Sequence, residues 1–222
     1  MTKTLIAVPC MDTLPLPFFT SFVSLRKPDG TNWAPISNCL IYDSRNIFSS
    51  NAIREGYERV LWLDSDMQFE PDLLERLSAD MDEDPGKKVI SALYFKRKIP
   101  TTPVIYKKLD YGQSEAWQIK ATVESYLDYP KDTLFEVEGC GFGAVLTNVD
   151  ILRDVWDSFG PPFDPMTHMG EDLSFCWRVK QLGEKIYCDS RVKVGHIGQY
   201  TFDESVYKAQ QSNAARAKPE GR

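Results

Sequence analysis

The sequence lacks the features that define several common classes of protein. No apolar run approaches the ~20 residues that a transmembrane helix needs. The five cysteines form no Cys-x-x-Cys pair, which favours free thiols in the reducing cytoplasm over a zinc ribbon or a disulfide framework. A net charge of −6 does not support a generally basic surface for nucleic acid, although basic residues cluster between Lys87 and Lys108.

Short apolar runs alternate with helical patterns along the N-terminal half of the chain. We expect strands at 5–8, 39–42, 60–63 and 89–94, and helices at 15–26, 44–55 and 71–80. This alternation predicts an α/β fold with a mostly parallel central sheet flanked by helices. The pieces at 104–106 and 117–123 predict a small antiparallel hairpin. Further on, we expect strands at 142–147, 185–188 and 192–194, and helices at 148–156 and 171–182.

The most informative segment is Val60-Leu61-Trp62-Leu63-Asp64-Ser65-Asp66. Its apolar part predicts a buried strand, and two carboxylates follow that strand directly. Such carboxylates repel each other unless a cation lies between or beside them. Ligands bind at the carboxyl ends of strands in open α/β sheets, and hard divalent cations share oxygen ligands with phosphates. The segment therefore predicts a metal held against a phosphorylated substrate; the alternative is a turn before the next helix.

A histidine lies where another strand is expected to end, in Gly195-His196-Ile197-Gly198. Flanking glycines allow this backbone to approach a ligand closely. Imidazole and two carboxylates together suit Mn²⁺. His196 is therefore a candidate metal ligand, and a hydrogen-bonded surface histidine is the alternative.

Two acidic residues open a helix after a long loop, in Met169-Gly170-Glu171-Asp172. The helix dipole stabilises carboxylates at this position, which is sufficient to explain them structurally. The functional interpretation is a general base held at a fixed point beside a loop that could close on substrate.

Alternating glycines precede a strand in Glu138-Gly139-Cys140-Gly141-Phe142-Gly143. Glycines in this context let backbone approach a bulky ligand, and a β-bulge is the alternative. The pattern is not Gly-x-Gly-x-x-Gly opening a helix, so it does not indicate a dinucleotide-binding fold.

Together these segments resemble the glycosyltransferases of the GT-A fold, most closely the family-2-like branch common in bacterial and phage genomes. The resemblance covers nearly the whole chain, from Leu5 to about Gly198. Besides the segments above, it includes Ala7-Val8-Pro9, Asp43-Ser44-Arg45-Asn46, and the pair Phe175 and Arg178. It implies a single GT-A-like catalytic domain over 1–202, with a nucleotide-binding half at 1–95, an acceptor-side half at 96–202, and a polar tail at 203–222.

The resemblance also implies roles for individual residues. Asp64 and Asp66 match the Asp-x-Asp motif of the family, and His196 matches its late metal ligand, which implies Mn²⁺ or Mg²⁺ as cofactor. Glu171 and Asp172 match the acceptor-side acidic pair, with Asp172 as the catalytic base. The implied donor-binding residues are Pro9, Arg45, Asp64, Arg97 and Gly141.

The implied reaction moves a sugar from a nucleotide-diphosphate sugar to an acceptor hydroxyl. A UDP-sugar is the favoured donor, and an acceptor glycan, a protein or a modified DNA base is the expected acceptor. We expect inversion at the anomeric carbon, because Asp172 suits the role of base and no second nucleophile is evident.

Three other interpretations fit the sequence less well. Sugar-phosphate nucleotidyltransferases usually carry a Gly-rich, basic loop after the first strand, whereas the turn here is Pro9-Cys10-Met11-Asp12. A dehalogenase-like phosphatase would place its Asp-x-Asp after the first strand. A non-catalytic nucleotide- or carbohydrate-binding module is the alternative from another class. Retention of Asp64, Asp66, Asp172 and His196 together makes that alternative less economical.

Overall fold

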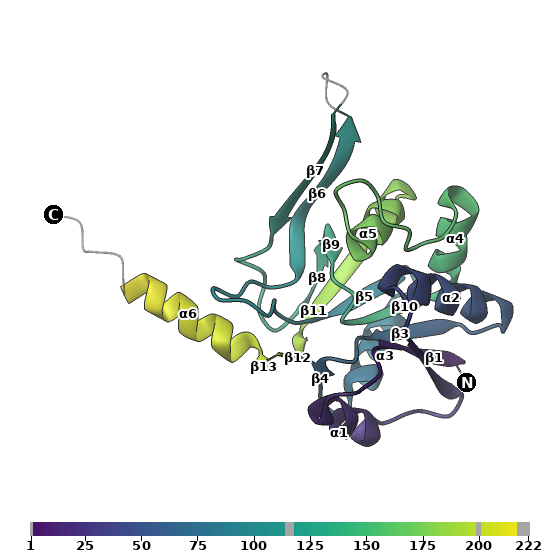
Figure 1. The fold of residues 1–222 in the computed structure, drawn as a ribbon, viewed down its shortest axis with the longest axis horizontal. Helices are drawn as coiled ribbons and strands as arrows, with labels where there is room; N and C mark the ends of the chain where they lie inside the picture. The colour runs from purple at the N-terminus through teal and green to yellow at the C-terminus, as the bar shows by residue number, and fades with distance from the viewer. Residues whose placement is uncertain (1, 114–117, 199–200, 217–222) are drawn as a thin grey trace.

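The apolar run before Asp64 forms strand β3 (Arg59–Leu63), which lies inside a seven-stranded sheet. The computed structural model describes residues 2–113, 118–198 and 201–216 (Figure 1). The strand order is β2-β1-β3-β10-β5-β11-β8. The other strands of this sheet are β1 (Thr4–Cys10), β2 (Thr31–Ser37), β5 (Val89–Leu93), β8 (Leu134–Val137), β10 (Ala144–Asn148) and β11 (Ile186–Lys193).

The sheet is mostly parallel, because only β10 and β8 run against their neighbours. The helices that pack on it are α1 (Leu16–Ser24), α2 (Ile41–Arg54), α3 (Leu73–Glu83), α4 (Val149–Phe159) and α5 (Glu171–Gln181). This architecture confirms the expected fold class, a mostly parallel α/β sheet flanked by helices with a small antiparallel elaboration.

Both faces of the central strands are buried. Ala7 and Trp62 join an apolar cluster with side chains of α2, α4 and α5, whereas Ile6 and Leu61 join a second cluster with side chains of α1 and α3. Successive side chains of a strand point to opposite faces, so a strand covered on both sides must be apolar throughout. This burial explains the unbroken apolar run before Asp64.

The strand expected at 39–42 was wrong. The chain instead forms β2 at Thr31–Ser37, turns at Asn38 with a φ of 55°, and begins α2 at Ile41. Among the described strands β2 pairs with β1 alone and forms one edge of the sheet, so none of its residues is fully buried and its few apolar residues form no continuous run. Pro35 is tolerated in β2 because an edge strand needs hydrogen bonds on one side only.

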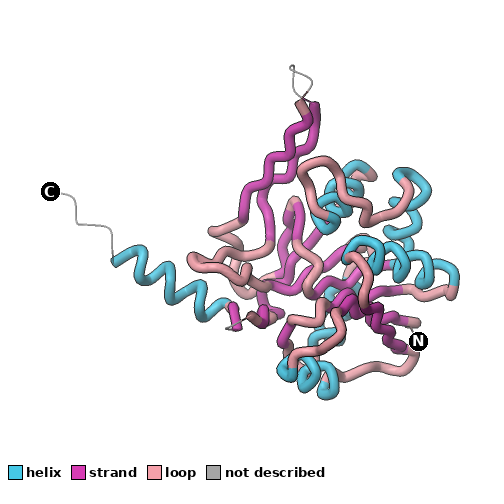
Figure 2. The backbone as a smooth tube through the Cα atoms, in the orientation of Figure 1, coloured by secondary structure: helices cyan, strands magenta, loops and turns pink. Residues whose placement is uncertain are grey.

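The predicted antiparallel hairpin is confirmed as β6 (Ile105–Gln113) paired with β7 (Ile119–Ser125). It stands out from the body of the molecule (Figure 2). Trp117, where the second strand was expected to begin, lies outside the described residues. The base of β6 also pairs with the short strand β9 (Gly139–Cys140).

A small second sheet crosses from the Asp-x-Asp turn to the histidine segment. It has the order β13-β12-β4, formed by β4 (Met67–Gln68), β12 (Gly195–Ile197) and β13 (Thr201–Phe202). Its register pairs His196 with Met67. The sheet therefore brings two segments far apart in the sequence to the same place.

Helix α6 (Glu204–Arg216) leads away from the sheet (Figure 1). Its first turns nevertheless pack on the body: Tyr207 is buried, stacks at 4.9 Å from Phe95, and donates a hydrogen bond to the Leu127 carbonyl. Residues 217–222 of the expected polar tail lie outside the described residues. Within the described part of the chain, no helix combines the length and apolarity that crossing a membrane requires.

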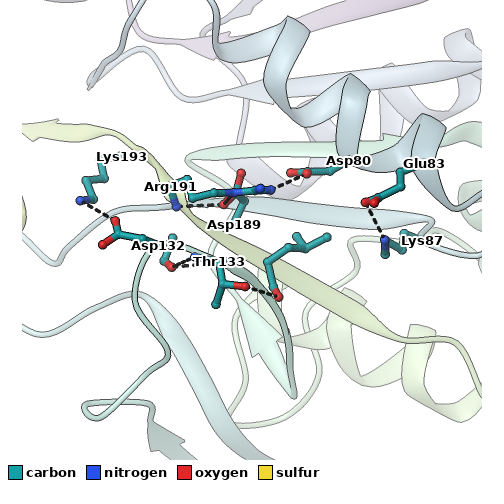
Figure 3. A network of polar contacts seen from close by, with 10 residues as sticks. Asp80, Glu83, Lys87, Asp132, Thr133, Asp189, Arg191 and Lys193 are labelled. Atoms are coloured by element: carbon teal, nitrogen blue, oxygen red, sulfur yellow. Dashed lines mark hydrogen bonds and ion pairs between the residues drawn. The ribbon is translucent and has the colours of Figure 1, made fainter.

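An ion network between a partly exposed arginine and two buried carboxylates ties α3 to β11 (Figure 3). Arg191 donates to Asp80 at 2.6 Å and to Asp189 at 2.8 Å, and both carboxylates are almost fully buried. Burial and the neighbouring Asp189 raise the pKa of Asp80, although Arg191 opposes them. One guanidinium thus compensates two buried carboxylates.

Replacing Arg191 with Ala should lower the free energy of unfolding at pH 7 by about 1–3 kcal/mol, because it leaves buried carboxylates without their shared cation. The loss should be smaller at pH 5 than at pH 7, because the raised pKa of Asp80 lets its carboxyl take up a proton more readily in the folded state. Urea unfolding at both pH values tests this. A loss independent of pH would show that Arg191 acts through packing alone.

Candidate active site

Asp66 and His196 face each other where the small sheet meets the end of β3. The Ile197 amide donates to the Asp66 carbonyl at 2.7 Å, which fixes the two backbones together. His196 Nδ1 lies 2.8 Å from the Phe95 carbonyl, which can only accept, so Nδ1 carries the proton. The other ring nitrogen, Nε2, lies 3.4 Å from Asp66 Oδ2. Nε2 is therefore the ring nitrogen that faces the carboxylate.

The two oxygens of Asp66 have different surroundings. Oδ1 is buried and has no hydrogen-bond partner among the described residues, whereas Oδ2 lies 2.9 Å from Arg97 Nη1. Burial would raise the pKa of Asp66, but the hydrogen bond from His196 and the charges of His196 and Arg97 outweigh burial and lower it. Asp66 is therefore an anion with one unused oxygen.

This arrangement fits a hard divalent cation. The Asp66 carboxylate, which has one unpaired oxygen, and Nε2 of His196 when it carries no proton are both suitable ligands for Mn²⁺ or Mg²⁺. Among the residues described, no group of three or more His, Cys, Asp or Glu side chains could hold a metal ion. Asp66 and His196 supply two ligands, and hard divalent cations take further ligands from water and substrate phosphates.

Asp64, the third expected metal ligand, is paired with Arg45. Arg45 projects from α2, is 2% exposed, and contacts the two Asp64 oxygens at 3.1 and 3.3 Å. It also donates to the Phe142 carbonyl at 3.2 Å. Burial raises the pKa of Asp64 to about 6, and Arg45 partly offsets this. Since Arg45 is enclosed and already paired, the geometry favours a positioning role over the expected contact with the donor.

Glu171 and Asp172 lie on the other side of Arg45, in the first turn of α5. Glu171 Oε1 is 3.7 Å from Arg45 Nε, so the guanidinium lies between Glu171 and Asp64. Asp172 accepts a hydrogen bond from the Leu173 amide at 2.7 Å. Burial and the charge of Glu171 raise the pKa of Asp172 to about 6. A carboxylate with this pKa is suited to general-base chemistry near neutral pH.

The alternating glycines make room for protein side chains rather than for a ligand. A side chain at Gly141 would overlap the Tyr94 hydroxyl, and one at Gly143 would meet Met67 Cε at 2.7 Å. The Gly143 amide donates to the Tyr94 hydroxyl at 3.2 Å, and the Tyr94 ring lies edge-on to His196 at 5.5 Å. Gly141 thus leaves room for Tyr94, whose ring packs against His196.

A cleft of about 560 Å³ opens beside the two aspartates. Pro9, Asp64 and Asp66 line it, so the structure gathers these three expected site residues in one place. The opposite wall of the cleft was not predicted from the sequence. Residues 39–42 were expected to form a strand, whereas residues 38–41 form a turn and the start of α2 that line the cleft. The remaining lining residues are Cys10, Met11, Asn38, Cys39, Leu40, Ile41 and Ser65.

No family model and no curated protein matches this chain. Among solved structures, the A197 protein from STIV is similar with a TM-score of 0.61 and 19% identity, over 89% of this chain and 86% of that one. GalNAc-T7, solved with UDP, GalNAc and Mn²⁺, has a TM-score of 0.57 and 11% identity, over 90% of this chain and 44% of that one. These likenesses show that the fold is GT-A-like.

Asp172→Asn should stabilise the protein at pH 8. The raised pKa of Asp172 means that the folded state holds its proton more tightly than the unfolded state, so stability falls as pH rises from about 4 to about 6. The neutral amide avoids this loss, which we estimate at roughly 1–3 kcal/mol. Urea unfolding at pH 8 and pH 4 measures it, with exposed Asp157→Asn as a charge-matched control. A gain of equal size at pH 4 would contradict the assignment to charge burial.

Proposed function

We propose that the chain is a metal-dependent glycosyltransferase that uses a nucleotide-diphosphate sugar. The observation that carries the proposal is the pair Asp66 and His196, in which a carboxylate with one unpaired oxygen faces the imidazole Nε2 beside a cleft. The GT-A-like fold supports it, and so does GalNAc-T7, a structure of that fold solved with UDP and Mn²⁺. Placement in the family-2-like branch is part of the same proposal.

In this proposal the cleft holds the donor with its diphosphate at Asp66. Pro9 and Leu40 supply apolar walls for the base, and Asp64, oriented by Arg45, faces the ribose. Asp66 and His196 would hold Mn²⁺ or Mg²⁺. The bound cation neutralises the negative charge that develops on the leaving diphosphate.

Asp172 is the proposed base. It takes the proton of the acceptor hydroxyl while that oxygen forms a bond to the anomeric carbon and the bond to the diphosphate oxygen breaks. One displacement with one base inverts the anomeric configuration. Glu171 is partnered by Arg45, so it acts by fixing the first turn of α5 and raising the pKa of Asp172. The acceptor can be a glycan, a protein or a modified DNA base.

A thermal-shift panel tests donor binding. UDP, GDP, CDP and dTDP are each added with and without Mn²⁺ to the wild type and to Asp66→Asn. A nucleotide at a hundred times its dissociation constant adds about 2.7 kcal/mol, which is roughly 5–11 °C for a domain of this size. We expect a shift from one nucleotide, UDP above all, that requires both Mn²⁺ and Asp66. Equal shifts in Asp66→Asn, or none from any nucleotide, would contradict the proposal.

The rate of transfer tests the base. With water as the acceptor, hydrolysis of the matching donor should rise with pH through about 6, because Asp172 must lose its proton to act. Asp172→Asn should keep the Mn²⁺-dependent thermal shift and lose roughly 100-fold or more in rate. Full activity in Asp172→Asn would show that another group accepts the proton.

A further inference from the structure

Arg97 contacts the oxygen of Asp66 that faces His196, so it lies where a metal held by both residues would bind. Its Nη1 lies 2.9 Å from Asp66 Oδ2, the same oxygen that His196 Nε2 approaches at 3.4 Å. The same nitrogen donates to the Ile197 carbonyl at 3.3 Å. The Arg97 guanidinium thus lies beside both candidate metal ligands, Asp66 and His196, and places a positive charge where the metal would bind.

A divalent cation held between Asp66 and His196 would lie next to the Arg97 guanidinium, and the two cations would repel each other strongly. The charge on Arg97 is permanent, so the side chain cannot relieve the repulsion by losing a proton. Asp66 and His196 are less able to move, because the Ile197 amide and the Phe95 carbonyl fix them. Metal binding at the pair therefore requires Arg97 to leave it.

The surroundings of Arg97 permit such a displacement. The residue lies in the turn 96–102, which the Lys96 amide closes by donating to the Thr102 carbonyl at 2.9 Å. The side chain is 48% exposed, whereas that of His196 is 14% exposed. Of these side chains, Arg97 is therefore the one with most room to move, because it lies at the exposed edge of the site.

We propose that Arg97 couples metal binding to nucleotide binding, an inference that rests on the proposed function. Without a nucleotide, Arg97 pairs with Asp66 and opposes the divalent cation. A nucleoside diphosphate beside Asp66 offers Arg97 a bidentate phosphate partner, and arginine leaves the carboxylate for it. Asp66 and His196 are then free to hold the metal, and the Arg97 guanidinium becomes a second positive charge beside the leaving diphosphate. Metal and nucleotide consequently strengthen each other's binding.

Titration of free Mn²⁺ by its electron paramagnetic resonance signal measures this coupling without any turnover. In the wild type, Mn²⁺ should bind weakly alone and at least tenfold more tightly with saturating UDP. Arg97→Gln should bind Mn²⁺ alone about tenfold more tightly than the wild type. The gain in Mn²⁺ affinity that UDP causes should be at least tenfold smaller in this variant than in the wild type. By reciprocity, the effect of Mn²⁺ on UDP affinity should fall by the same factor.

Lys98→Gln is the matched control, because it removes the same charge from the same exposed turn without a contact to Asp66. It should behave as the wild type. If Arg97→Gln binds Mn²⁺ alone no better than Lys98→Gln while UDP and Mn²⁺ still bind through Asp66, the coupling role is overturned and the proposed function stands. If neither the wild type nor either variant binds Mn²⁺ in the presence of UDP, GDP, CDP or dTDP, both proposals are overturned.

Discussion

The contact between Asp66 and His196 is the constraint on which the site depends. Residues 130 positions apart meet because β4 and β12 pair immediately after the carboxylate and around the histidine. Tyr94 and the glycines that admit it then hold the imidazole ring from the side. The pairing of β4 with β12 thus brings a carboxylate oxygen and an imidazole nitrogen within reach of one cation. Residues close together in the sequence could not create this arrangement.

Buried charge is concentrated around this contact. Arg45 lies between Asp64 and Glu171, and burial raises the pKa of both Asp64 and Asp172 to about 6. Asp64 and Asp172, when ionised at neutral pH, each lower the free energy of unfolding relative to a neutral residue of the same shape. Clusters of perturbed groups beside a cleft are typical of functional sites, because stability is sacrificed there for chemistry.

The sequence predicted the parts of the fold that depend on strong apolar periodicity. β3, the hairpin and α5 were expected close to where they occur. The edge strand β2 was missed, because none of its residues is fully buried and it lacks the continuous apolar run of a central strand. Among site residues, Pro9, Asp64 and Asp66 were expected to share a site and do line one cleft. The pairing of Arg45 with Asp64 was not expected, because the partner of a buried charge is chosen by tertiary packing.

The central claim is that Asp66 and His196 hold a divalent cation against a nucleoside diphosphate. The most direct test is a crystal structure with Mn²⁺ and UDP, using anomalous scattering to locate manganese. The account predicts one anomalous peak about 2.0–2.3 Å from an Asp66 oxygen and from His196 Nε2, in contact with the diphosphate. UDP bound in the cleft with manganese absent from this pair, or bound elsewhere, would contradict it.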